Sequence, residues 1–391
     1  MIGEKFATNY GQWVRRAVAQ KRGQKDIITF FDSSVPEPTA LVQQVVSEAF
    51  SGPITSRYAS AFNGGNPFIL DLLANRYGLG RESVLGTTGA TSALSLIYRA
   101  LVQPGEHILV ETPGFDLFQE LAQSQGIRVS QFSRDGDRFT VNLNDLVARL
   151  QPTTKLIVIS NLHNPSGMAV STADLETLAR LVEARGIRVV VDEVYGEYAD
   201  YDTRPRAAAQ ISPAFISVSS LTKIYGLSTL RCGWIVAAPE IMLPIRTLAD
   251  RTDVSISNLA HAVAALILEQ PAKFDAYTRN MVGEARPLVE ESLRLWKAER
   301  LVDGILPEFG CIFFPRLVGI ENSAAFVDWL AKRSGVLIAP GEFFGAPGHI
   351  RIGFARELGE LKAGLSALTD GLRTFRAHIG AGDARRSVIS G

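Results

Sequence analysis

The sequence predicts an α/β protein in which a mostly parallel sheet lies between layers of helices. Strand-like and helical patterns alternate from Ser83 to Val218, as they do in chains that build parallel sheets. Within this region the run from Ile187 to Val191 is almost continuously apolar and β-branched, which is typical of a strand buried on both faces. After Pro239 the pattern changes to helices followed by short strands, which indicates a second, smaller α+β unit.

The N-terminal part begins with an amphipathic helical pattern at 10–21, a strand at 27–31 and a helix at 39–50 that Thr39 is expected to cap. Residues 51–67 are rich in Gly, Ser, Asn and Pro and indicate a long functional loop. The alternating region follows. Its expected elements are strands at 84–88, 107–110, 127–132, 155–160, 187–191 and 214–218, and helices at 90–101, 115–124, 143–150 and from Ser171, where Asp174 completes a weak capping box.

The C-terminal part is expected to hold three helical stretches, including a long one at 272–297. Strands follow at 311–314, 336–338 and 350–354, and a final helix at 358–376. We expect residues 1–45 to form an N-terminal arm that completes the small domain. The large domain is expected at 46–245, the small C-terminal domain at 246–376, and a disordered tail at 377–391.

Composition excludes several classes of protein. The chain has 391 residues, 46% of them hydrophobic and 20% charged, with 40 basic and 40 acidic side chains. This neutral balance provides no basic field for nucleic acid or an anionic membrane, and no apolar run approaches the length of a membrane span. The start lacks the apolar core of a signal peptide, and the only two cysteines, Cys232 and Cys311, fit a reducing compartment, so a cytoplasmic protein is expected. The five histidines have no metal-ligand spacing, and no metal site is expected.

The most informative stretch runs from Ser219 to Gly233 and follows the strand-like run at 214–218. Lys223 lies among small and hydroxyl residues, where a lysine can lose its proton and attack an aldehyde. Ser220 and Arg231 could together hold a dianionic phosphate. An aldehyde and a phosphate on one ligand describe pyridoxal 5'-phosphate (PLP). The alternative for this stretch alone is a surface loop with a solvated lysine and arginine.

Polar residues also follow two neighbouring strands. Asp192 ends the strand at 187–191 and would be costly there without a partner, which a protonated pyridine nitrogen could supply. Asn164, before Pro165, could donate its amide to a phenolic oxygen, and Tyr195 could reach the same oxygen. The alternatives are an acid that caps the next turn, an ordinary Asn-Pro-Ser-Gly turn and a core tyrosine.

Three further features fit the same ligand. Gly89, Ala90 and Thr91 open a helix directly after a strand, where free N–H groups can bind a phosphate. Phe115 could stack on a cofactor ring or belong to the core. Arg351 lies in an apolar strand and needs an anion, either a substrate carboxylate or an internal salt bridge.

Together these motifs resemble the class I/II aminotransferases of PLP fold type I, in that family's order across roughly residues 27–376. The resemblance implies a seven-stranded sheet, an internal aldimine at Lys223, and a phosphate site at Ser220, Arg231 and Gly89–Thr91. It further implies that Asp192 pairs with the ring nitrogen and that Asn164 and Tyr195 bind the phenolic oxygen. Phe115 would stack and Arg351 would bind the substrate carboxylate. Tyr58 matches a tyrosine that reaches the neighbouring subunit's phosphate in a homodimer with shared sites.

The sequence departs from the family pattern at Thr229, at Cys232 and in the turn Ser33 to Pro36, where Ser34 is expected to face the substrate. The expected activity is ping-pong transfer of an amino group from an L-amino acid to a 2-oxo acid. The alternatives are a PLP-dependent lyase (β-elimination, C–S lyase type) or a cyclising enzyme. A DNA-binding regulator would need an extra module, and a dehydrogenase would need a GxGxxG motif that no predicted strand precedes. The amino donor is open: Arg57, Arg246 and Arg251 are candidates for a second carboxylate site, while Tyr10, Phe62 and Phe343 would favour a bulky or apolar side chain.

Overall fold

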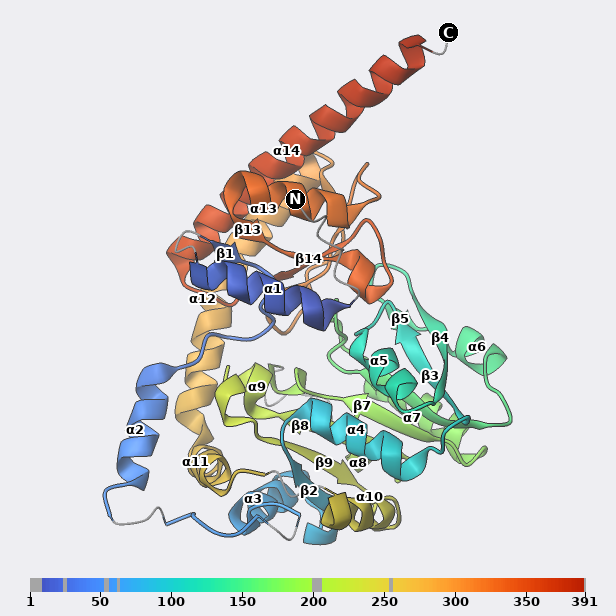
Figure 1. Cartoon of the computed structure of the whole chain (residues 1–391), viewed down its shortest axis with the longest axis vertical. Coiled ribbons are helices and arrows are strands. Elements are labelled where there is room, and N and C mark those ends of the chain that lie inside the picture. Colours follow the sequence, from blue (N-terminus) through green and yellow to red (C-terminus); the bar gives the residue numbers. More distant parts are fainter. Residues whose placement is uncertain are drawn as a thin grey trace.

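The computed structural model describes residues 9–23, 27–52, 56–61, 64–198, 206–252 and 256–389. Its main sheet has eight strands in the order β2-β9-β8-β7-β6-β3-β4-β5 (Figure 1). The strands are β2 (Val84–Thr87), β3 (His107–Thr112), β4 (Arg128–Asp135), β5 (Thr140–Val141), β6 (Thr154–Ser160), β7 (Arg188–Asp192), β8 (Phe215–Ser220) and β9 (Gly233–Ala237). Neighbours from β8 to β4 pair in parallel, whereas β9 and β5 form antiparallel pairs. The prediction of a mostly parallel sheet is therefore confirmed.

The predicted number of seven strands is wrong by one. The six strand ranges expected from the pattern also leave out β9 (Gly233–Ala237). The other strand they leave out, β5, has two residues and pairs with the end of β4 across a turn, with Asp135 opposite Thr140. A strand this short carries no readable alternation of polar and apolar residues, which is why the sequence pattern did not reveal it.

The two faces of the sheet are covered by different helices. Ile108 and Val110 of β3 point to one face, where they pack with α4 (Ala90–Leu101), α5 (Leu117–Ser124) and α10 (Pro239–Thr252). Leu109, between them, points to the other face and packs with α6 (Leu143–Ala148), α7 (Thr172–Glu183) and α8 (Ala208–Ile211). Each such side chain stabilises the fold by about 1.5–3 kcal/mol when fully buried. Burial on both faces explains the continuous apolar runs in the sequence.

A third group of helices packs beside β2 and β9: α2 (Thr39–Ala49), α3 (Pro67–Tyr77) and α11 (Asn258–Glu269). The sequence pattern predicted a loop at 51–67 and did not indicate α3. Its signals are ordinary ones: Asn66 caps the helix by accepting the N–H groups of Phe68 and Ile69, Pro67 occupies its first turn, and Gly78 ends it with φ 62°. Thr39 was expected to cap α2, but Thr39 is the first residue of the helix and Pro38 precedes it, without a side-chain cap.

The N-terminal and C-terminal parts of the chain meet. Strand β1 (Ile28–Thr29) pairs in parallel with β13 (Val336–Leu337), and helix α1 (Tyr10–Gly23) lies beside them (Figure 1). The short strands β10 (Val302–Asp303), β11 (Ile312–Phe313), β12 (Arg316–Leu317), β14 (Ala339–Pro340) and β15 (Ile350–Gly353) form two further small sheets. Helix α12 (Pro271–Ala298) runs from the main sheet to this part, which α13 (Ser323–Ser334) and α14 cover (Figure 1). The expected domain boundaries remain predictions.

The final helix is longer than predicted. Helix α14 (Leu358–Ile389) continues past 376 and projects from the rest of the chain, where a disordered tail was expected (Figure 1). Its two late glycines cost only about 1 kcal/mol each, and the alanines and arginines between and after them favour helix. The predicted tail at 377–391 remains a prediction, as do the domain boundaries.

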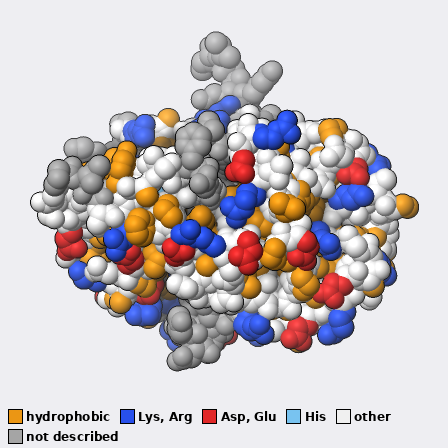
Figure 2. Space-filling view, turned by 90° about the horizontal axis from the view of Figure 1, so that it is seen from below, with side chains coloured by type: hydrophobic (Ala, Val, Ile, Leu, Met, Phe, Trp, Pro, Cys, Tyr) orange, Lys and Arg blue, Asp and Glu red, His pale blue; other side chains and the backbone are white. Residues whose placement is uncertain are grey.

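The surface carries both signs of charge. On the face in Figure 2, lysine and arginine side chains alternate with aspartate and glutamate around scattered hydrophobic groups, and neither sign dominates. Within the described ranges no helix is long and apolar enough to cross a membrane. The same ranges contain no group of three His, Cys, Asp or Glu side chains that could hold a metal ion.

Candidate active site

The candidate site lies where the parallel strands end. Strands β6, β7 and β8 are neighbours, and Ser160, Asp192 and Ser220 are their last residues. Ligands of open α/β sheets bind at this carboxyl edge. A cavity of about 200 Å³ opens there, and it brings together most of the predicted site residues. Those that line it are Ala90, Thr91, Phe115, Asn164, Asp192, Tyr195, Ser220, Lys223, Arg231 and Arg351.

Lys223 lies on the one-turn helix α9 (Leu221–Ile224), which Ser220 caps at the end of β8. Its Nζ donates a hydrogen bond to the Ser33 Oγ at 3.1 Å. Burial, with a smaller contribution from the nearby Arg351 guanidinium, lowers the pKa of Lys223 to about 8. A substantial fraction of the amine is therefore neutral near physiological pH, as a nucleophile for an aldehyde requires.

Asp192 is buried at the end of β7. Its Oδ1 accepts the Val194 N–H at 3.2 Å. Burial raises its pKa from the ordinary 3.8 to about 7, and the charge of Glu111 adds to this, whereas the Val194 hydrogen bond and Lys223 oppose it. A carboxyl group held in this way favours a ligand that brings a positive charge or an N–H group to it, such as a pyridinium.

Tyr195 and Asn164 lie on the loops that follow β7 and β6. Tyr195 is almost fully buried, and burial raises the pKa of its hydroxyl, so the hydroxyl stays protonated at neutral pH. The Asn164 backbone N–H donates to the Ser160 Oγ at 2.9 Å, and the Asn164 Oδ1 accepts from the Arg351 Nη1 at 2.8 Å. With its oxygen engaged by arginine, the amide NH₂ group of Asn164 remains a donor for a ligand.

Arg351 lies on β15 and is 1% exposed. Its Nη2 donates to the Phe31 carbonyl at 3.0 Å and to the Tyr10 hydroxyl, and its guanidinium lies 4.8 Å from the centre of the Phe344 ring. No carboxylate in the described part of the chain forms an ion pair with it, and its Nε has no hydrogen-bond partner there. The internal salt bridge considered from the sequence is therefore not found among these residues, and the guanidinium suits an incoming carboxylate.

The predicted phosphate site surrounds the start of α4. Gly89 precedes this helix with φ 90°, and no side chain caps the helix, so its first N–H groups are available to an anion. The Arg231 Nη2 donates to the Thr88 carbonyl at 3.2 Å, which fixes the guanidinium beside Gly89. A Cβ atom on Gly89 would lie only 2.8 Å from that Nη2. The Thr88 hydroxyl is buried without a partner in the described residues.

Two predicted site residues, Ser34 and Tyr58, do not line the cavity. Ser33, not Ser34, lines the cavity and contacts Lys223. Phe31, Ser33 and Val35 are buried while Asp32 and Pro36 are exposed, so a two-residue alternation in the sequence already favoured Ser33. Tyr58 is 47% exposed and does not line the cavity of this chain.

Of the residues considered for substrate selection, Tyr10 lines the cavity. The centre of the Phe343 ring lies 6.1 Å from the centre of the Tyr10 ring. Phe62 lies outside the described residues. Arg57 pairs with Glu269, and the Arg246 Nη2 donates to the Val84 carbonyl at 2.8 Å, so neither serves as a second carboxylate site in this chain. Arg251 lines a shallow surface pocket instead. The Phe115 ring lines the cavity and meets the Tyr10 ring edge-on at 6.1 Å.

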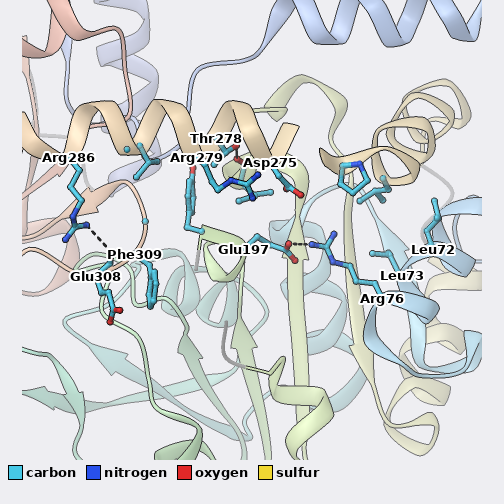
Figure 3. A pocket seen from close by; sticks show the side chains of 17 residues that line it. Leu72, Leu73, Arg76, Glu197, Asp275, Thr278, Arg279, Arg286, Glu308 and Phe309 are labelled. Carbon is cyan, nitrogen blue, oxygen red and sulfur yellow. Dashed lines mark hydrogen bonds and ion pairs between the residues drawn. The ribbon is translucent and has the colours of Figure 1, made fainter. Parts of the chain in front are cut away.

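A larger cleft of about 620 Å³ lies on the other side of α9, between α12 and the end of α3 (Figure 3). It is lined by Ile224, next to the catalytic candidate, and by the ion pair of Arg76 with Glu197. Its lining contains no lysine and therefore no group that could bind an aldehyde covalently. The smaller cavity is the one with the required chemistry.

Comparisons with known proteins agree with this geometry. The model of the family described as aminotransferase class I and II matches residues 42–368. The chain belongs to this family. Its members use PLP, so the resemblance and the cofactor inferred from the sequence are confirmed.

Individual relatives and solved structures support the same assignment. The chain is 32% identical to capreomycidine synthase of Streptomyces vinaceus over 74% of this chain and 75% of the relative. It is 26% identical to an arginine–pyruvate transaminase of Pseudomonas aeruginosa over 86% and 88%. A PLP-dependent aminotransferase from Streptococcus suis superposes with a TM-score of 0.80 at 25% identity, covering 92% of this chain and 97% of that one. Aspartate aminotransferase of Thermus thermophilus has the same fold, with a TM-score of 0.82 at 20% identity over 94% and 97%.

The side chains in the cavity fit PLP on their own chemistry. Lys223 would bind its aldehyde, Asp192 its ring nitrogen and Asn164 and Tyr195 its phenolic oxygen. The phosphate would lie against the start of α4, Ser220 and Arg231. Three observations support this fit: the buried Asp192 carboxyl forms no ion pair among the described residues, helix α4 is uncapped, and the Arg231 guanidinium lies close to Gly89.

The phosphate site is tested by Gly89→Ala. The new methyl group would displace the Arg231 guanidinium, and we expect the dissociation constant for PLP to rise about tenfold, which corresponds to roughly 1.4 kcal/mol. Gly186→Ala is the matched control, because Gly186 also has a positive φ (65°) but a Cβ there would meet nothing within 4 Å. Both variants carry backbone strain, and only Gly89→Ala should weaken cofactor binding in a fluorescence titration. Equal effects would contradict the assignment.

The raised pKa of Asp192 predicts a pH-dependent stability of the apoprotein. Because the folded state holds this proton up to about pH 7 and the unfolded state releases it near pH 4, stability falls as pH rises through that window. Asp192→Asn keeps the acceptor for Val194 and removes the titration. Between about pH 4 and pH 8 the wild type should lose on the order of 4 kcal/mol relative to this variant. Urea unfolding of both apoproteins at several pH values measures the difference, and parallel curves would refute the prediction.

Proposed function

We propose that the enzyme transfers the amino group of an L-amino acid to a 2-oxo acid in a ping-pong cycle. The observation that carries this proposal is one cavity that holds a lysine of lowered pKa, a buried carboxyl and an arginine without a carboxylate partner in the described chain. PLP, when bound, supplies the aldehyde and the electron sink that amino-group transfer needs. The protein must supply the base, the charge at the ring nitrogen and the orientation of the substrate.

Lys223 has the position and the pKa for the base. Its Nζ would hold the cofactor first and then, displaced by the substrate amine, would take the proton from the substrate Cα. Arg351 would bind the substrate carboxylate, with Asn164 fixing the guanidinium at 2.8 Å. This fixes which bond of the substrate Cα faces Lys223. Asp192 would remain ionised opposite a protonated ring nitrogen, and Tyr195 would donate its hydroxyl proton to the phenolic oxygen.

A second candidate function is cyclisation of an amino acid. The 32% identity to a protein named capreomycidine synthase favours it. The same base, arginine and buried carboxyl would serve either reaction, because the outcome depends on how the substrate lies over the lysine. The same residues would also serve β-elimination, and none of the relatives described above is named for that activity.

We further propose a cytoplasmic homodimer with shared sites. Tyr58 is a large aromatic residue left 47% exposed, which fits a residue that reaches the phosphate of the neighbouring subunit. Both cysteines are unpaired and buried, which fits a reducing compartment. The N-terminal Tyr10 and the aromatic groups around it would contact the substrate side chain and favour a bulky or apolar donor.

Transamination is tested by adding single L-amino acids to the holoenzyme and following the visible band of the bound cofactor. The band should disappear with the correct donor and return when a 2-oxo acid is added. Release of ammonia would indicate elimination, and an amino acid converted with its nitrogen retained would indicate cyclisation. Lys223→Ala should slow the half-reaction by about 10²–10⁴-fold or more. Its melting temperature, compared with that of the wild type, controls for misfolding, and turnover at the wild-type rate would refute the role of Lys223.

A further inference from the structure

A buried ion pair lies behind the candidate site. Glu111, near the end of β3, and Arg134, near the end of β4, have side chains that are 0% and 1% exposed, and the Glu111 Oε2 lies 2.6 Å from the Arg134 Nη2. The Arg134 Nε donates to the same oxygen at 2.7 Å. Neither residue lines the cavity. A buried ion pair seldom adds net stability over apolar side chains of the same size, so its other contacts indicate what it does.

The second carboxylate oxygen of Glu111 holds Ser160. It accepts the Ser160 backbone N–H at 2.9 Å and the Ser160 hydroxyl at 2.5 Å. Arg134 also donates from Nη2 to the Ser160 carbonyl at 2.9 Å. The hydrogen bonds that Glu111 receives from Arg134 and Ser160 all come from donors, and they favour its ionised form. They oppose the burial that raises the pKa of Glu111. Ser160 is therefore held through its N–H, its hydroxyl and its carbonyl.

The direction of the Ser160 hydroxyl determines how it contacts Asn164, the residue that holds Arg351. A hydroxyl has one proton, and Ser160 gives it to Glu111, so its lone pairs face the Asn164 N–H at 2.9 Å. The Asn164 Oδ1 in turn accepts from Arg351 at 2.8 Å. A continuous series of hydrogen bonds therefore runs from the ion pair inside the sheet to the arginine proposed to bind the substrate carboxylate.

We propose that Glu111 is a positioning residue for substrate binding: clamped by Arg134, it orients Ser160 and thereby places Asn164 and the Arg351 guanidinium. This inference rests on the proposed role of Arg351. Glu111 touches neither the substrate nor the cofactor site, and it acts through the turn that follows β6. The role requires acceptor-only geometry at Glu111, which glutamine does not provide, because its NH₂ group would face either Arg134 or Ser160.

The test measures binding of unreactive carboxylates to the holoenzyme by calorimetry, with 3-methylbutanoate and 3-phenylpropanoate as probes. Ser160→Ala removes the hydroxyl and leaves the ion pair intact, and Glu111→Gln removes the acceptor. Both variants should raise the dissociation constant for the probes about tenfold. This is the effect expected from the loss of one hydrogen bond to a charged group. The dissociation constant for PLP should rise less than that for the probes. Of the proposed cofactor contacts only the Asn164 hydrogen bond to the phenolic oxygen depends on Ser160, while Lys223, Asp192 and the phosphate site do not.

The matched control is Thr154→Val. The Thr154 Oγ1 and the His107 Nδ1 form a buried hydrogen bond at 2.8 Å between β6 and β3, the strands of Ser160 and Glu111, but at the opposite edge of the sheet. The Thr154→Val variant should reduce the melting temperature about as much as Ser160→Ala does, and it should leave carboxylate binding unchanged. If Ser160→Ala and Thr154→Val have the same effect on the probes, the pair is only structural and the proposal is overturned.

Arg351→Lys separates this inference from the proposed function. Lysine lacks the fork that binds a carboxylate with two parallel hydrogen bonds, so the probes should bind at least about tenfold more weakly. If the probes bind to Arg351→Lys as well as to the wild type, Arg351 does not bind the substrate carboxylate. The proposed function is then wrong at this residue, and the positioning role of Glu111 is wrong with it. If Arg351→Lys loses the probes and Ser160→Ala does not, the proposed function stands and the positioning role of Glu111 fails.

Discussion

Asp192, Lys223 and Arg351 share one small cavity, and none of them forms an ion pair with another residue in the described part of the chain. Burial acts on the first two in opposite directions: it raises the pKa of the carboxyl to about 7 and lowers that of the amine to about 8. Both shifts bring the groups close to the pH at which an acid–base catalyst works best. The rest of the fold serves to hold these groups out of water without neutralising one another.

Such a site lowers the stability of the empty protein, and the sheet offsets that cost. Strands β6, β7 and β8 bury apolar side chains on both faces, under helices on each side. Asp192 is the last residue of β7 and Lys223 follows the end of β8, so ladder hydrogen bonds fix the backbone at or just before these two residues. Arg351 lies within β15 of a smaller sheet. A ligand that supplies the missing charges would therefore stabilise the fold by mass action.

The sequence predicted the main sheet and most of the site for the same reason. A strand buried on both faces reads as an apolar run, and Asp192 and Ser220 each end such a run, so strand and site residue were recognised together. Features that depend on distant contacts were not recognised. The Glu111–Arg134 pair joins two strands through side chains that look unremarkable in sequence, and Ser33 was passed over for its neighbour although the alternation with Phe31 and Val35 favoured it.

The proposed binding site for the substrate carboxylate illustrates why local motifs could not reveal all of it. Tyr10 comes from the N-terminal helix, Asn164 from the turn after β6, and Arg351 from a strand near the C-terminus, yet the last donates to both of the others. These three segments are separated by more than 150 residues of chain at each step and meet only because β1 pairs with β13 and α1 lies beside them. The affinity for a substrate carboxylate is therefore a property of how the N-terminal helix, the main sheet and the C-terminal strands are placed together. Glu111 holds one of these segments, the turn after β6 that carries Asn164, and it reaches the carboxylate site only through that turn, without lining the cavity.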